Sequence, residues 1–66
     1  MKLKLSRNKI MLIMARKCWK RSDLAKAYGV SSSRINIILG AAEVSTVVVG
    51  RMAAALGVDV TEIIEE

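Results

Sequence analysis

The segment 19–38 constrains the fold of this chain more than any other part of the sequence. It reads WKRSDLAKAYGVSSSRINII and holds two short stretches of helical apolar periodicity that are separated by one glycine. Leu24 marks the buried face of the first stretch and Ile35 that of the second, while Gly29 suits the tight turn between them. The spacing therefore predicts two short helices joined by a turn, in the manner of a helix-turn-helix unit.

The length and the cysteine count limit what can hold such a fold together. Sixty-six residues are near the lower limit for a single hydrophobic core, so we expect one domain, 1–66. Cys18 is the one cysteine and there is no histidine, which excludes an internal disulfide and the usual zinc sites. We interpret Cys18 as a tolerated small residue in a loop. We expect no cofactor and no metal, so the stability must come from packing.

Membrane insertion, secretion and catalysis find no support in the sequence. Apolar residues make up 53% of the chain, yet the longest unbroken apolar run, 10–15, is far too short to span a bilayer. The basic N-terminus is not followed by the long apolar stretch and cleavage site of a signal peptide. We therefore expect a soluble, cytoplasmic protein without a membrane partner. No group of residues suggests a catalytic centre, so we do not expect an enzyme.

Positive charge is concentrated in the N-terminal part of the chain. Nine of the 11 Lys and Arg residues lie within the first 26 positions, and the formal net charge is +5. Such an excess favours an anionic partner through long-range attraction and counterion release. A solvated basic surface without a partner is the alternative interpretation, and composition alone does not decide between the two.

Serine and glycine mark the ends of the expected helices, because the chain contains no proline. The pattern predicts no strands and five helices, at about 7–17, 21–28, 32–39, 46–56 and 61–65. Helix N-caps are assigned to Ser6, Ser31 and Ser45, and helix ends to Gly29, Gly40 and Gly57. Gly50 falls inside the fourth helix, where glycine costs roughly 1 kcal/mol relative to alanine. We therefore expect another backbone to approach Gly50 closely; a glycine that is tolerated there without a packing role is the alternative.

Helical periodicity also identifies the side chains that should form the core. The expected core residues are Trp19, Leu24, Val30, Ile35, Ile38, Val49, Met52, Leu56 and Ile63. In the first helix, Ile10 and Ile13 lie three positions apart and form an inward stripe. This pattern indicates an all-α fold whose helices surround one core.

The sequence, with this turn, these caps and this core pattern, resembles the lambda-repressor-like, Xre-type helix-turn-helix family. The resemblance covers nearly the whole chain and is most specific in DLAKAYGVS, in the helix that holds Ile35 and Ile38, in VGRMAAALGV and in the closing VTEII. It implies a compact five-helix domain, often dimeric, whose third helix enters the major groove of double-stranded DNA. The function it implies is that of the DNA-binding domain of a small transcriptional regulator.

Carried over position by position, the resemblance also implies a set of DNA contacts. The residues are Lys20, Arg21, Ser32, Ser33, Arg34 and Asn36. Arg34 would pair with guanine edges or a phosphate, and Asn36 carries the donor and acceptor that adenine needs, whereas the two serines discriminate poorly between bases. Lys20 and Arg21 stand where the family usually has threonine and glutamine. This change keeps affinity for phosphate but alters the contact geometry.

After the third helix the sequence departs from the family pattern, in which basic and polar residues are usual. The positions expected to face outward here carry Ile37, Ala41, Ala42, Val44, Val47 and Val48. On a small domain these six side chains would form one contiguous apolar patch, which is typical of a binding surface. A second function is therefore open: a protein-interaction module, natural or engineered on this scaffold, that uses the patch to bind a partner protein or a second copy of itself.

Overall fold

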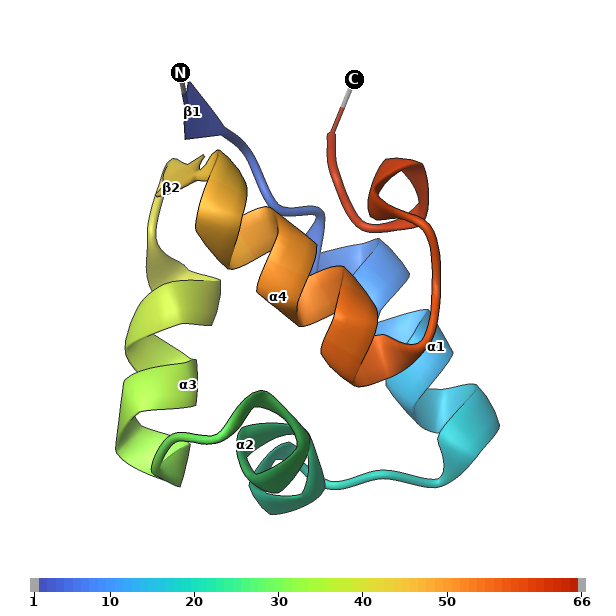
Figure 1. Ribbon diagram of the computed structural model, residues 1–66. Coiled ribbons are helices and arrows are strands. Elements are labelled where there is room, and N and C mark those ends of the chain that lie inside the picture. The colour runs from blue at the N-terminus through green and yellow to red at the C-terminus, as the bar shows by residue number, and fades with distance from the viewer. Residues whose placement is uncertain (1, 66) are drawn as a thin grey trace.

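The computed structural model describes residues 2–65, which form four α-helices, one short 3-10 helix and a two-stranded ribbon (Figure 1). The elements are β1 Lys2–Leu3, α1 Arg7–Lys17, α2 Arg21–Tyr28, α3 Ser32–Gly40, β2 Val44–Ser45, α4 Thr46–Leu56 and η1 Val60–Glu62. Helices dominate, as the sequence predicts, but the expected fifth α-helix is wrong. In its place η1 forms a single 3-10 turn, closed by the Ile63 N–H, which donates to the Val60 carbonyl at 3.2 Å.

Most helix ends follow the local chemistry of serine and glycine, but Gly40, expected to end the third helix, is the last residue of α3, and Ala41 in an extended conformation is the C-cap. The hydroxyls of Ser6, Ser31 and Ser45 each accept a hydrogen bond from the backbone N–H three residues further on, at 3.2–3.3 Å. This confirms the three expected caps. Gly57 ends α4 with a φ of +71°, in the left-handed region that favours glycine. Cys18 ends α1 with a φ of +57°, and no sequence signal indicates that a side chain there adopts this conformation.

The N-terminal segment forms the ribbon that the sequence pattern did not predict. Lys2 pairs with Ser45 and Leu3 with Val44, in antiparallel register. The expectation of no strands is therefore wrong. Two-residue strands are too short to show an alternating pattern, and these two form because segments distant in sequence pair with each other. The pairing satisfies backbone groups of the extended chain that precedes α1.

The C-terminal segment returns to the same N-terminal segment. The Ser6 N–H donates to the Ile63 carbonyl at 2.7 Å, and the Glu65 N–H donates to the Lys4 carbonyl at 2.9 Å. Because Ile64 pairs with Leu5 in an extended bridge, the chain leaves helical geometry after η1. This pairing is the physical reason why the helix expected at 61–65 does not form.

A single core lies between the helices. Its largest fully buried side chains are Ile10, Leu24, Ile35, Met52, Leu56, Ile63 and Val49. Trp19 and Val30, expected inside, are half-buried and pack against its edge. Arg51 links α4 to α2, because its guanidinium donates to the Tyr28 carbonyl at 3.3 Å and lies 4.6 Å from the centre of the Tyr28 ring.

Gly50 does not have the close neighbour that its position in α4 suggested. A Cβ atom built on this exposed residue would meet no atom within 4 Å. The expected close approach of another backbone is therefore wrong. Packing in residues 2–65 does not require glycine at this position.

Candidate nucleic-acid interface

The turn between α2 and α3 sets the angle at which α3 leaves the body of the domain. Gly29 adopts a φ of +94°, and its N–H donates to the Ala25 carbonyl at 2.8 Å. The Val30 N–H donates to the same carbonyl at 3.0 Å, and Ser31 then caps α3. This tight turn is the one that the glycine spacing predicts.

Helix α3 presents one buried face and one exposed face. Ile35, Ile38 and Leu39 are buried, and they anchor the helix to the core. The side chains on the other side are exposed: Ser32, Ser33, Arg34, Asn36 and Ile37. All four α3 residues to which the resemblance assigns DNA contacts are thus accessible to a ligand, and Ile37 lies among them.

Two of the residues expected to contact DNA meet across α2 and α3. A guanidinium N–H of Arg21, the first residue of α2, donates to Oδ1 of Asn36 in the middle of α3. This hydrogen bond orients the Asn36 amide and leaves its N–H donors available. Lys20, the N-cap of α2, is exposed beside them, and its backbone N–H donates to the Asp23 carboxylate at 2.9 Å. The fold therefore brings Arg21 and Asn36 together, although 15 positions separate them in sequence.

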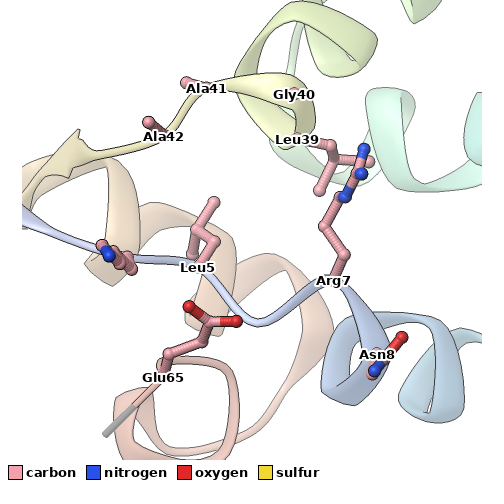
Figure 2. Close-up of a pocket in the computed structure, with 9 residues that line it drawn as sticks. Leu5, Arg7, Asn8, Leu39, Gly40, Ala41, Ala42 and Glu65 are labelled. Carbon is pink, nitrogen blue, oxygen red and sulfur yellow. The ribbon is translucent and has the colours of Figure 1, made fainter.

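A cavity of about 440 Å³ lies at the other end of α3, where the chain leaves the helix. Its lining residues are Lys4, Leu5, Arg7, Asn8, Leu39, Gly40, Ala41, Ala42 and Glu65. Figure 2 shows the Arg7 side chain reaching from the start of α1 towards Leu39 near the end of α3. Lys4 and Arg7 thus lie beside a loop that has no basic residue of its own.

Sequence reasoning did not assign Lys4 and Arg7 to a binding site. Both belong to the basic N-terminal region, but no motif or spacing relates them to α3. Their placement depends on the ribbon and on the way α1 packs, which are long-range features of the fold. The general excess of positive charge in the first 26 residues was the one signal that pointed towards them.

The apolar patch expected after α3 is smaller than the sequence suggested. Val44 is 8% exposed, because its strand β2 pairs with Leu3 and turns the side chain inward, so its placement on the surface is wrong. Val48 is half-buried and packs against the core. Ile37 and Val47 are 62% and 68% exposed, and Ala41 and Ala42 are also exposed. The remaining apolar surface therefore depends on two large side chains.

Metal-binding clusters and membrane-spanning helices are both absent from the part of the chain that the structure describes. Within residues 2–65, no group of three or more His, Cys, Asp or Glu side chains is arranged to hold a metal ion. None of the helices described is long and apolar enough to cross a membrane.

Comparison with known proteins agrees with this geometry. The family model for the Cro/C1-type helix-turn-helix DNA-binding domain matches residues 9–65, which include α2, the turn and α3. No curated protein and no solved structure matches the chain significantly. Lys4 and Arg7 precede the matched residues, so any role for them rests on the structure alone.

Proposed function

The chain belongs to the Cro/C1-type helix-turn-helix DNA-binding domains, and we propose on this premise that it binds double-stranded DNA as the DNA-binding domain of a small transcriptional regulator. In this proposal α3 lies in the major groove. The observation that carries it is the exposed face of α3, where Arg34 and Asn36 are accessible and Arg21 of α2 is hydrogen-bonded to Asn36.

Each proposed contact follows from the chemistry of its side chain. Asn36 reads an adenine edge, and the hydrogen bond from Arg21 holds its amide in one orientation before DNA arrives. Arg34 contacts a guanine edge or a phosphate, while Lys20 and Arg21 contact phosphates. Ser32 and Ser33 add hydrogen bonds near the start of α3 without strong base preference.

The second group of phosphate contacts comes from the N-terminal segment. The loop after α3 carries Ala41, Ala42 and Glu43, so it cannot supply cations to the DNA backbone. Arg7 and Lys4 line the cavity beside this loop and are exposed. In this arrangement Arg7 and Lys4 replace the missing loop cations at the C-terminal end of α3.

Salt dependence of duplex binding tests the proposal. The affinity of the full chain for a random-sequence duplex is measured by fluorescence anisotropy over a series of salt concentrations. Alanine at Lys20, Arg21, Arg34 or Arg7 should each reduce the slope of log K against log salt by about one unit, because one phosphate contact is lost. Arg16→Ala is the matched control, since it removes the same charge from the end of α1 that lies on the opposite side of the molecule from α3 (Figure 1).

Two results would count against DNA binding. The first is the absence of any binding to duplex DNA at low salt. The second is a combined Lys20, Arg21 and Arg34 variant that binds with the same affinity and the same salt slope as the parent chain.

Protein binding through the remaining apolar surface is the second candidate function, favoured by the exposure of Ile37 and Val47. Asp at either position should leave the unfolding midpoint nearly unchanged, because surface substitutions usually alter stability by less than about 0.5 kcal/mol. The same substitution should abolish self-association or partner binding, because it buries an unpaired charge. Sedimentation of the parent chain and both variants measures this effect. A parent chain that sediments as a monomer excludes the homodimer form of this candidate.

A further inference from the structure

Ile37 occupies the middle of the exposed face of α3. Successive residues of an α-helix are rotated by about 100°, which places Ile37 between Arg34 on one flank and Asn36 on the other. Its side chain is 62% exposed, although the helices already bury a complete set of apolar residues on the opposite face of α3. A large apolar side chain at this position therefore adds little to the stability of the fold.

A helix that presents this face to the major groove must bring Ile37 against base edges. Most groups in the groove are hydrogen-bond donors or acceptors, and covering one of them with an isoleucine removes its water without replacing the lost hydrogen bond. The C5 methyl group of thymine is the apolar exception. An isoleucine in the centre of the face is thus compatible with thymine and unfavourable beside guanine or cytosine.

We propose that Ile37 is a specificity-determining residue that selects thymine by packing on its C5 methyl group. The neighbouring Asn36, oriented by Arg21, is suited to adenine, so the two adjacent side chains favour a run of A·T base pairs. This inference rests on the proposed DNA-binding function and specifies A·T-rich DNA as the kind of sequence that the domain recognises.

Removing only the methyl group from the DNA tests the inference. The protein is titrated, at one fixed salt concentration, into the alternating duplex poly(dA-dT) and into poly(dA-dU), which lacks the C5 methyl group. The parent chain should bind poly(dA-dT) about fourfold more tightly, the effect expected from burying one group of methylene size. Ile37→Ser should bind the two duplexes equally.

Leu12→Ser is the matched control, because it removes an apolar side chain of similar exposure from α1, outside the surfaces proposed for binding. It should keep the parent's preference for thymine, and circular dichroism melting should show that both variants remain folded. Comparing the two duplexes for each protein separates the effect of the methyl group on the DNA itself from its contact with Ile37.

The possible outcomes distinguish failure of the thymine contact from failure of DNA binding itself. Equal binding of the two duplexes by the parent chain, or an Ile37→Ser variant that still prefers poly(dA-dT), overturns the thymine contact while leaving DNA binding intact. A Leu12→Ser variant that loses the preference also overturns it, because the discrimination would then not belong to Ile37. No binding of the folded parent chain to either duplex at low salt overturns the proposed function itself.

Discussion

Replacing Gly50 with alanine should make this protein more stable. Gly50 lies in the interior of α4, is exposed, and would have no atom within 4 Å of an added Cβ. Alanine therefore adds no steric clash and gains the whole helix-propensity difference, about 1 kcal/mol. For a domain of this size, that free energy raises the thermal unfolding midpoint by about 4–8 °C. Thermal unfolding followed by far-ultraviolet circular dichroism measures this shift in the unfolding midpoint.

Gly57→Ala, at the C-cap of the same helix, is the matched control. Gly57 has a φ of +71°, and the nearest atom to an added Cβ is the Lys17 Nζ at 3.9 Å. An added Cβ would fit there, but alanine is strained at this positive φ, so the substitution should lower the free energy of unfolding by about 1–2 kcal/mol. A Gly50→Ala variant that unfolds at a lower temperature than the parent would refute the reasoning. It would mean that another part of the chain approaches α4 at Gly50, contrary to the structure.

Substitutions at three further positions test other parts of the fold. Ile35 is fully buried, so Ile35→Ala should lower the free energy of unfolding in urea by about 2–5 kcal/mol, and an unchanged midpoint would contradict the inward orientation of α3. Cys18→Gly should raise stability by about 1 kcal/mol by relieving the φ of +57°, whereas Cys18→Ala should not, and equal midpoints for these two variants would exclude backbone strain there. Hydrogen bonds from the hydroxyl and then the backbone N–H of Thr61 hold the pKa of the Asp59 carboxyl below its ordinary value of 3.8. The ionised Asp59 carboxyl therefore stabilises the fold fully above pH 3.8, and this contribution is lost as the pH falls through the lowered pKa. An NMR titration should show the midpoint of Asp59 moving back towards 3.8 in Thr61→Val. A midpoint at or above 3.8 in the parent chain would contradict the lowered pKa.

Local sequence determined the helices and their ends. The bounds of α2 and α4 agree with the expected 21–28 and 46–56, because the N-cap serine of α4 and the glycines that end both helices act on neighbouring backbone groups. The division of α3 into a buried and an exposed face likewise follows from a helical period within nine residues. The exposure of the expected DNA contacts on α3 was therefore predictable, while their binding to DNA stays a prediction.

Contacts between segments distant in sequence decided the rest. Local pattern placed Val44 on the surface, but pairing with Leu3 turns it inward, and pairing of the C-terminal segment with 4–5 replaces the expected last helix by η1. The same long-range packing brings Arg7 beside the end of α3 and Arg21 onto Asn36. Helical periodicity describes only neighbours within about two turns. Which basic groups surround α3, and how much apolar surface remains beside it, depends on tertiary packing across the whole chain.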